Sequence, residues 1–480
     1  MPDEPVPTSR ARRTARVSGT AARIAARSTG ARIATRRRTP AEQRAAVAQQ
    51  QLAAARALVD LLGGLRGAAM KVGQTISTVD LMLVPGDIRE EFQQILASLQ
   101  QHAEPVGFPA LRRVVEADLG RRLGTLFSEV DPEPLAAASI GQVHRGRLKD
   151  GRDVVLKIQY PGIAEAVHSD LRNLRLALKL LNVIAPGLDS AAVAQELRER
   201  ITDELDYRLE AANQAAMAET YEGHPFIVVP APIPEVCGER VLVSEFVDGR
   251  HFADMLERPA EERNRLGEIL TRFYLNGPMR HRLLNGDPHP GNVLFLNDGR
   301  VAFLDFGFFK RLGDQDVQDL ILTTRATLEG DAEALMRVVV RLGALPEDSG
   351  LADAFLEHYR ALFGWLLTTE PLTIEPGGTR RIMRHYHDLR ASEGLRGLRL
   401  PAEHLVLTRA FMLSVGQLEK LKPTNVWLDI AREWVLGDAP VTELGQLEHT
   451  FFCARTIPRK EPRHDPDDDR RREPVAAHVR

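Results

Sequence analysis

The sequence predicts an α+β protein of two lobes, a small mixed lobe followed by a larger helical one, with a helical extension in front. Two β-like runs at 141–148 and 153–160 flank the turn Lys149–Gly151, which predicts a hairpin in the small lobe. Apolar residues spaced three to four apart predict helices on both sides of these runs. A short hairpin at 293–304 interrupts the second helical region. Two lobes of this kind are typical of proteins that bind a ligand between them.

Length and composition indicate a folded protein of two or three domains. The 480 residues are 44% hydrophobic and 27% charged, and the net charge of −3 gives no reason to expect a specific nucleic-acid partner. The two cysteines, Cys237 and Cys453, form neither a disulfide framework nor a metal cluster, which favours a cytoplasmic setting. No apolar run reaches the roughly 18 residues of a transmembrane segment, so we expect any membrane contact to be peripheral. The sequence does not predict an oligomeric state.

Residues 1–38 form a basic arm. Ten arginines lie between Arg10 and Arg38, and no acidic residue occurs between Glu4 and Glu42. Such a segment is either a solvated, disordered tail or a surface attracted to anionic lipid or another polyanion. Near an anionic membrane each basic residue contributes about 1 kcal/mol. Both interpretations stay open from the sequence.

Order is predicted to start with Thr39, Pro40 and Glu42, which form a capping box with proline at the first helical position. The extension that follows has helical spacing. β-like runs come next, the last two at 226–236 and 240–249, and the chain's end is charged and Pro-rich, which predicts disorder. We divide the chain into a basic arm (1–38), a helical extension (39–130), a small lobe (131–248), a large helical lobe (249–455) and a disordered charged tail (456–480).

The stretch Asn285–Gly307 carries the strongest chemical pattern. Asp287 precedes Asn292 by five residues, and Asp305 opens the triplet Asp-Phe-Gly after the hairpin. This is the spacing of a kinase catalytic loop and its metal-binding aspartate. Asn292 and Asp305 offer the hard oxygen ligands that Mg²⁺ prefers, and Asp287 would stand where the acceptor's proton must go. We therefore predict ATP and Mg²⁺ as cofactors in a two-lobed protein-kinase-like fold.

Lys157 is one of only eight lysines and lies in the apolar run 153–160. An ammonium in such a strand needs anionic partners, which ATP phosphates and one carboxylate can supply. Glu204, Asp206 and Glu210 follow in the helical region. We pair Lys157 with Glu210 and include both in the predicted catalytic set.

The predicted phosphate loop departs from the glycine-rich loop of ordinary protein kinases. It reads "AAASIGQVH", with one glycine. Alanines let backbone N–H groups approach phosphate but permit fewer left-handed conformations, so we expect a nucleotide to be held differently and to react poorly. The residues assigned to the cofactor site are Ala136, Ala137, Ala138, Ser139, Gly141 and Lys157, with Glu245 and Val247 of the run 240–249.

Six motifs together resemble the UbiB/AarF-type atypical kinase-like proteins, which are associated with quinone-lipid biosynthesis. They are "KVGQ", "AAASIGQVH", "VVLKIQYPG", "ELDYRLEAAN", "DPHPGN" and "LDFG". They occur in the family's order and cover roughly residues 50–310, with a weaker helical match to about 440. The resemblance implies that Lys157 and Glu210 are the conventional kinase ion pair.

The resemblance also implies a regulatory lid. In that family the Lys-x-Gly-Gln motif packs over the active site where a protein substrate would dock. Carried over, Lys71, Gly73 and Gln74 would face the nucleotide cleft. Glu204 and Asp206 match the family's Glu-x-Asp motif, with Glu204 as the expected partner of Lys71.

Three features depart from the family's pattern. Bacterial members often have a histidine two residues before the catalytic aspartate, where this chain has Asn285. Many members end in hydrophobic membrane-spanning segments, whereas this chain ends in charged residues. A helix predicted near Asp314 follows Asp305 so closely that little room remains for an activation segment, and no Ala-Pro-Glu follows. This last feature weighs against phosphorylation of a protein in trans.

The predicted function is that of an Mg-ATP-dependent atypical kinase or ATPase in quinone or other isoprenoid-lipid metabolism. The expected partners are ATP and ADP, with anionic lipid, a quinone-pathway lipid or a pathway enzyme as further candidates. Two alternatives remain. One is a small-molecule phosphotransferase of the aminoglycoside or choline kinase type, whose catalytic loop Asn285–Gly307 also resembles. The other is a non-catalytic binding module gated by ATP. A conventional protein kinase fits least.

Overall fold

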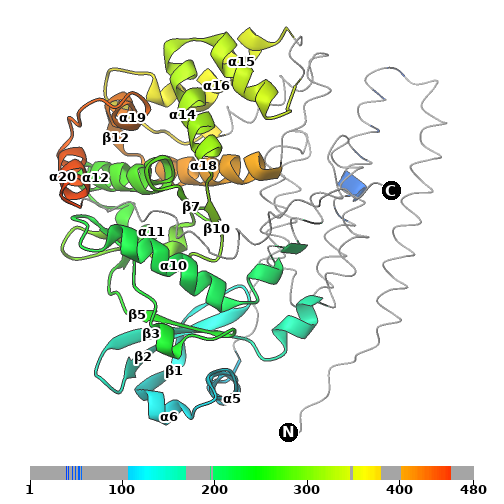
Figure 1. The fold of residues 1–480 in the computed structure, drawn as a ribbon, viewed down its shortest axis with the longest axis vertical. Helices are drawn as coiled ribbons and strands as arrows, with labels where there is room; N and C mark the ends of the chain where they lie inside the picture. The colour runs from blue at the N-terminus through cyan, green and yellow to red at the C-terminus, as the bar shows by residue number, and fades with distance from the viewer. Residues whose placement is uncertain are drawn as a thin grey trace, which may run out of the picture.

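The computed structural model describes residues 106–168, 201–345, 350–379 and 402–455, with isolated positions at 39–56 and 195–199. A small lobe built on a four-stranded sheet lies at one end of the long axis, and a helical lobe lies at the other (Figure 1). The predicted two-lobed α+β architecture is confirmed.

Three predicted segments lie outside the described residues: the arm 1–38, the Lys-x-Gly-Gln stretch of the extension and the tail 456–480. The start of the extension is described at a few positions. The Glu42 N–H donates to Thr39 Oγ1 at 3.4 Å, and the Thr39 N–H donates to the Glu42 carboxylate at 2.9 Å. These two bonds are the reciprocal pair of a capping box, which confirms that prediction.

The small-lobe sheet is antiparallel with the order β1-β2-β3-β5. β2 (Gly141–Leu148) and β3 (Asp153–Gln159) form the hairpin predicted around Gly151, which has a φ of 93° that glycine adopts at low cost. β5 (Val241–Glu245) pairs with the other side of β3. β3 is therefore a central strand, and Lys157 stands in the middle of the sheet.

β1 (Phe127–Ala137) is a strand that the sequence did not predict. It is an edge strand, largely exposed, and its pairing with β2 is interrupted by three register shifts. Pro132 and Pro134 lack N–H donors, which an edge strand tolerates but a sequence pattern cannot distinguish from a loop.

Two helices cover the sheet, α5 (Phe108–Leu119) and α6 (Leu123–Leu126). The apolar stripe of α5 packs against β3 and β5 in one core. Both helices fall within the range predicted as extension, and β1 begins at Phe127 rather than near 131. The stripe needs an apolar partner, and the sheet face provides it, so α5 and α6 contribute buried side chains to the small lobe's core.

α10 (Tyr207–Tyr221) lies between the sheet and the helical lobe (Figure 1). The run 226–236 that follows is strand only at β4 (Ile227–Val228), after which come irregular backbone and the short helix η2 (Pro234–Val236). Three prolines in this run remove ladder donors, so its hydrophobic pattern did not produce a long strand. β4 pairs in parallel with a strand of the large lobe instead.

The large lobe opens with two small sheets that hold the predicted catalytic segment, Asn285–Gly307. β6 (Arg250–His251), β8 (Val293–Phe295) and β9 (Val301–Phe303) join β4 in the order β4-β9-β8-β6. The pair β7 (Leu283–Asn285) and β10 (Phe309–Arg311) is antiparallel. The predicted hairpin 293–304 is thus present as β8 and β9.

Helices make up most of the rest of the large lobe. The main apolar core includes fully buried Trp427 and the stacked rings of Phe273 and Phe303, whose centroids lie 3.6 Å apart. The elements are α11 (Phe252–Met255), α12 (Ala260–Thr271), the π-helical turn η3 (Arg272–Asn276), α13 (Gly277–His281), α14 (Asp314–Glu329), α15 (Ala332–Arg341), α16 (Ala352–Phe363), η5 (Gly364–Leu366), α18 (Ala402–Leu421), α19 (Trp427–Val435) and α20 (Glu443–Ala454), with the short strands β11 (Leu372–Thr373) and β12 (Thr424–Asn425).

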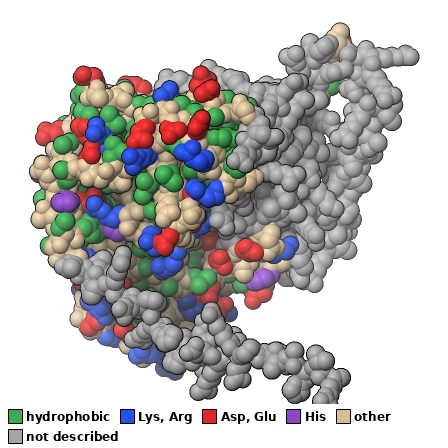
Figure 2. Space-filling view, turned by 45° about the horizontal axis from the view of Figure 1, so that its top comes forward, with side chains coloured by type: hydrophobic (Ala, Val, Ile, Leu, Met, Phe, Trp, Pro, Cys, Tyr) green, Lys and Arg blue, Asp and Glu red, His purple; other side chains and the backbone are tan. Residues whose placement is uncertain are grey.

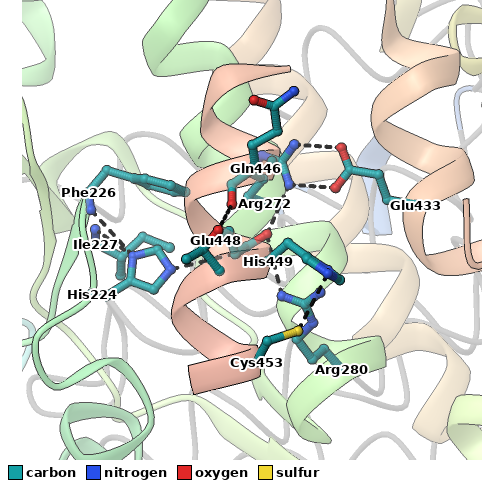
Figure 3. A network of polar contacts seen from close by, with 12 residues as sticks. His224, Phe226, Ile227, Arg272, Arg280, Glu433, Gln446, Glu448, His449 and Cys453 are labelled. Carbon is teal, nitrogen blue, oxygen red and sulfur yellow. Dashed lines mark hydrogen bonds and ion pairs between the residues drawn. The ribbon is translucent and has the colours of Figure 1, made fainter. Parts of the chain in front are cut away.

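A buried arginine ties these helices together. Arg272 has no exposed surface, and its guanidinium donates to the carboxylates of Glu433 and Glu448 at 2.8–2.9 Å (Figure 3). It also donates to the Glu268 carboxylate at 2.8 Å and to Thr442 Oγ1 at 2.9 Å. The partners come from α12, α19, α20 and the residue that caps α20. Because each donor has an acceptor, the buried guanidinium is satisfied and fixes the mutual position of these elements.

The described surface has mixed charge. Figure 2 shows acidic, basic and apolar side chains intermingled over the large lobe. Within the described ranges, no helix has both the length and the hydropathy to cross a membrane.

Candidate active site

The hairpin β8–β9 sets the spacing of the catalytic segment. The turn between the strands closes with the Gly299 N–H donating to the Leu296 carbonyl at 3.1 Å, and Gly299 has a φ of 85°. At the other end of the hairpin the Leu304 N–H donates to the Asn292 carbonyl at 3.0 Å. Asn292 and Asp305 therefore emerge side by side where the two strands separate.

Lys157 joins the two lobes at this point. Its Nζ lies 2.7 and 2.9 Å from the two carboxylate oxygens of Glu210, and 3.2 Å from Oδ2 of Asp305. The three residues come from β3, α10 and the turn after β9. The Glu210 side chain is 7% exposed and that of Asp305 is 34% exposed. One carboxylate is thus buried against the ammonium, and the other is partly exposed to solvent.

The cluster of Lys157, Glu210 and Asp305 has one basic and two acidic side chains. Burial lowers the pKa of Lys157, but the nearby Asp305 and Glu210 outweigh it, so the pKa is well above its usual value and the side chain is an ammonium. Burial raises the pKa of Glu210 to about 7; Lys157 opposes the rise and Asp305 adds to it. Two carboxylates therefore share one ammonium. A cation beside Asp305 would relieve their repulsion.

Asp287 is held by a residue far away in the sequence. Nη2 of Arg409, on α18, donates to Oδ1 of Asp287 at 3.0 Å, and the Arg409 guanidinium also lies 4.6 Å from the centre of the Phe308 ring. The Arg409 side chain is 9% exposed and that of Asp287 is 25% exposed. Sequence reasoning missed Arg409 because no local motif marks it. One of many arginines, it reaches the loop only through the packing of α18.

Asn285 connects the two turns that carry Asp287 and Asp305. Its Nδ2 donates to the Asp305 carbonyl at 2.8 Å, and its Oδ1 accepts the Asp287 N–H at 3.0 Å. The residue is 4% exposed. The Asn285 amide therefore gives both a donor and an acceptor to the loop backbones. This asparagine is thus a structural link between Asp287 and Asp305.

The alanine-rich segment forms the end of the β1–β2 hairpin. Ala136 and Ala137 are the last residues of β1 and pair with β2, and the Ala138 N–H donates to the Gly141 carbonyl at 2.8 Å. Ser139 lies at the tip of this hairpin. A Cβ on Gly141 would lie 2.2 Å from the Ile158 carbonyl oxygen, so glycine is needed there for strand packing. The hairpin end therefore lies beside β3, the strand that carries Lys157.

The two residues assigned to the cofactor site at the end of β5 differ in their contacts. The Glu245 carboxylate accepts the Ala231 N–H at 3.0 Å, and its own N–H donates to the Ala231 carbonyl at 3.0 Å. Glu245 is therefore committed to holding the segment after β4. Val247 is half-buried in the irregular chain after β5, between the two lobes.

Asn292 and Asp305 together fit an Mg²⁺ ion that is bound to the phosphates of a nucleotide. Among the described residues there is no group of three or more His, Cys, Asp or Glu side chains able to hold a metal ion alone. Mg²⁺ in phosphoryl-transfer sites takes only one or two protein ligands and fills its shell with phosphate and water. Asn292 Nδ2 donates to the Asp287 carbonyl at 3.4 Å, which leaves its Oδ1 as the ligand atom, and Asp305 offers a partly exposed carboxylate.

Comparison with known proteins finds a family match and similar sequences. Residues 98–339 match the family model of the ABC1 atypical kinase-like domain. The chain is 32% identical to Protein ACTIVITY OF BC1 COMPLEX KINASE 1, chloroplastic, of Arabidopsis thaliana over 390 residues, and 32% identical to the mitochondrial atypical kinase COQ8B of Rattus norvegicus over 303 residues. These matches cover 79% and 62% of this chain.

A solved structure is similar along most of the chain. Rv3197 of Mycobacterium tuberculosis, determined in complex with erythromycin, has 30% sequence identity and a TM-score of 0.58, covering 78% of this chain and 93% of that one. The chain belongs to the ABC1/AarF (UbiB-type) family of atypical kinase-like proteins. The family resemblance inferred from the six motifs is confirmed. The chain spans 55% and 57% of the lengths of the Arabidopsis and rat relatives.

The lid motifs of the ABC1/AarF family are only partly described. Lys71, Gly73 and Gln74 lie outside the described residues, so their position stays a prediction. Glu204 is half-buried just before α10. Asp206 caps that helix by accepting the Arg208 N–H at 3.0 Å. Asp206 of the Glu-x-Asp motif therefore caps the start of the helix that carries Glu210.

The interval between Asp305 and the next helix is short, as the sequence predicts. β10 ends at Arg311, and α14 begins at Asp314 with its N-terminus capped through Asp316. The activation segment of a protein kinase lies in the corresponding interval. Here β10 and the start of α14 take up that interval and leave little room for such a segment.

Proposed function

We propose that this ABC1/AarF family member binds Mg-ATP between its lobes and acts as an atypical kinase or ATPase. The observation that carries the proposal is the contact of one ammonium, Lys157, with both Glu210 and Asp305. It joins a central strand, a helix and the Asp-Phe-Gly turn in the arrangement that positions ATP phosphates in kinases.

Each residue then has a role. Lys157 binds the nucleotide's phosphates while Glu210 keeps it in place. Asp305 and Asn292 hold Mg²⁺, which neutralises the charge on the phosphate oxygens. Asp287 accepts a proton from the attacking hydroxyl or water, and Arg409 orients its carboxylate. The main chain of residues 136–141 covers the phosphates, and Glu245 and Val247 border the base.

We further propose that the reaction serves quinone or other isoprenoid-lipid metabolism at a membrane surface. The support is membership in a family associated with quinone lipids, together with the basic arm 1–38. ATP and ADP are the nucleotide partners, and an anionic or quinone-pathway lipid, or a pathway enzyme, is the further partner. Lys71, Gly73, Gln74 and Glu204 would act as the lid that limits access to the site.

Nucleotide binding with and without Mg²⁺ tests the site. The wild type should bind ATP more tightly with Mg²⁺, and Asp305→Asn should lose that difference and the turnover. Asp298→Asn, in the exposed turn of the same hairpin, is the matched control and should behave like the wild type. Unchanged metal dependence in Asp305→Asn would remove Asp305 from the metal site.

The dependence of ATP turnover on anionic lipid tests the proposed role at a membrane surface. ATP turnover should rise with anionic vesicles for the full chain and rise less for a chain that begins at Thr39. Equal stimulation of both would exclude the arm as the lipid contact.

A small-molecule phosphotransferase is the second candidate, favoured by the short interval between Asp305 and α14. Stoichiometric phosphorylation of a soluble alcohol would establish it. Nucleotide binding without turnover, even with lipid, would instead favour a binding module gated by ATP.

A further inference from the structure

The large lobe contains a cavity behind the catalytic segment. Its volume is about 190 Å³, and it is lined by residues of η3, α13, α14, α16, α18 and α19, the last four of which are labelled in the large lobe in Figure 1. Its lining is mostly apolar, with side chains such as Leu275, Met279, Phe355 and Phe411. An apolar cavity of roughly 150 Å³ in a protein core admits a benzene-sized molecule, so this one has room for a small ligand.

The cavity wall also carries buried polar atoms. Asn276 is 4% exposed, and neither its amide nitrogen nor its amide oxygen has a hydrogen-bond partner within the described ranges. The indole nitrogen of Trp434, another lining residue, is buried and also lacks a partner there. Buried polar groups without partners are costly and rare in native proteins, and a bound polar group is one way to satisfy them.

Asn276 is the last residue of a π-helical turn. η3 separates α12 from α13 and contributes Tyr274, Leu275 and Asn276 to the wall. Single π turns within helices are infrequent and occur often at functional sites. The local widening of the helix is thus a second observation at the same place.

The cavity shares its wall with the active site. Leu284 lines it and precedes Asn285, which links the two catalytic turns. On α18, Thr408 and Ala410 line it, and between them Arg409 donates to Asp287. A molecule in the cavity would press on the segment of α18 that positions the Asp287 carboxylate.

We propose that this cavity binds a small, mainly apolar molecule bearing one hydroxyl or carbonyl group, and that its binding changes the Arg409–Asp287 contact. The polar group bonds to the Asn276 amide, and the apolar body fills the space between α14, α16 and α18. The effect on turnover rests on the proposed function, whereas binding does not.

The matched pair 1-naphthol and naphthalene tests binding to the full-length protein by calorimetry. 1-Naphthol should bind saturably at one site, about tenfold more tightly than naphthalene, because its hydroxyl satisfies the amide. Asn276→Leu should remove this preference while keeping the affinity for naphthalene, and it should raise the melting temperature. Ala431→Leu, which fills the cavity from α19, should weaken both ligands. No saturable binding, or the same preference in Asn276→Leu, would overturn the site.

Hydrogen exchange at residues 284–292 tests the coupling independently of ATP chemistry. 1-Naphthol should change exchange there in the wild type and not in Ala431→Leu, and ATP turnover should change in parallel. Binding with no change in exchange would refute the coupling. Changed exchange in a protein without turnover would preserve this inference and refute the proposed function instead.

Discussion

A single buried side chain, Arg272, links several helices of the large lobe. Its guanidinium is out of contact with solvent and satisfies three carboxylates from different helices. Replacing one member of such a set leaves the other charges buried without compensation, which costs more than the set itself contributes to stability.

Arg272→Met should therefore lower the free energy of unfolding by about 3–5 kcal/mol. Arg258→Met is the matched control, because Arg258 pairs with Glu262 on the surface and such pairs contribute less than about 1 kcal/mol. Urea denaturation of both variants measures the difference. Equal losses would contradict the role given to burial.

His224 should make stability depend on pH. Burial, with neighbouring positive charges, lowers its pKa to about 3, and its Nδ1 accepts the Ile227 N–H at 3.1 Å. The unfolded chain binds a proton below about pH 6.5 while the native state does not, so stability falls from pH 6.5 toward 3 by up to about 1.4 kcal/mol per unit. The charged and titratable groups around it are Arg272, Arg280, Arg455, His281 and Glu448.

Urea midpoints between pH 7.5 and 5 measure this dependence. His224→Asn keeps an acceptor near Nδ1 and removes the titration, so its stability should fall less steeply with falling pH than that of the wild type. His281, whose pKa burial also lowers to about 3, adds to the fall, whereas Glu210, whose pKa burial raises to about 7, opposes it. If the pH dependence of stability in His224→Asn equals that of the wild type, groups other than His224 cause it.

Among the elements, the β1–β2 hairpin combines strand packing with the phosphate binding that we propose. Gly141 faces the backbone of β3, whereas Ala138 lies at the turn. Substitutions at these two positions should consequently separate folding from nucleotide binding.

Gly141→Ala should destabilise the protein by about 1–3 kcal/mol, because the added methyl group would collide with the Ile158 carbonyl. Gly124→Ala is the control: nothing lies within 4 Å of a Cβ there, and the residue is helical. Thermal melts compare the two, and a loss for Gly124→Ala as large as that for Gly141→Ala would contradict the account.

Ala138→Gly should change the ratio of ATP to ADP affinity, since glycine adds backbone conformations to the turn over the phosphates. Competition binding with both nucleotides measures the ratio, and melting temperature serves as the control for folding. An unchanged ratio in a folded variant would exclude the turn as the source of nucleotide preference.

For the molecule as a whole, the proposed site is shared between lobes. Lys157 and Glu210 come from the small lobe, and Asn292 and Asp305 come from the large one. A ligand that contacts both lobes stabilises their joint folded state in proportion to its affinity.

Mg-ATP at about one hundred times its Kd should raise the free energy of unfolding by about 2.7 kcal/mol. Lys157→Met should abolish this increase, and Lys310→Met, in the strand pair β7–β10, serves as a control. Differential scanning fluorimetry with and without Mg-ATP measures the shift. A full shift in Lys157→Met would separate nucleotide binding from this cluster.

The amino-acid sequence alone was enough to predict the two lobes, the hairpins at 141–160 and 293–304, and the spacing of Asp287, Asn292 and Asp305. These features depend on local periodicity and turn chemistry, which neighbouring residues encode directly. The sequence did not predict β1 or the irregular backbone within 226–236. Both contain prolines, and edge strands and irregular segments share this composition.

Which distant groups meet became clear only from the packed structure. Lys157 contacts Glu210 across 53 residues, and Arg409 contacts Asp287 across 122. The cavity and the unpartnered Asn276 amide likewise arise, within the described ranges, from the packing of helices far apart in the chain. Such contacts depend on how whole elements pack, and a carboxylate or guanidinium carries no local sign of the partner it will meet.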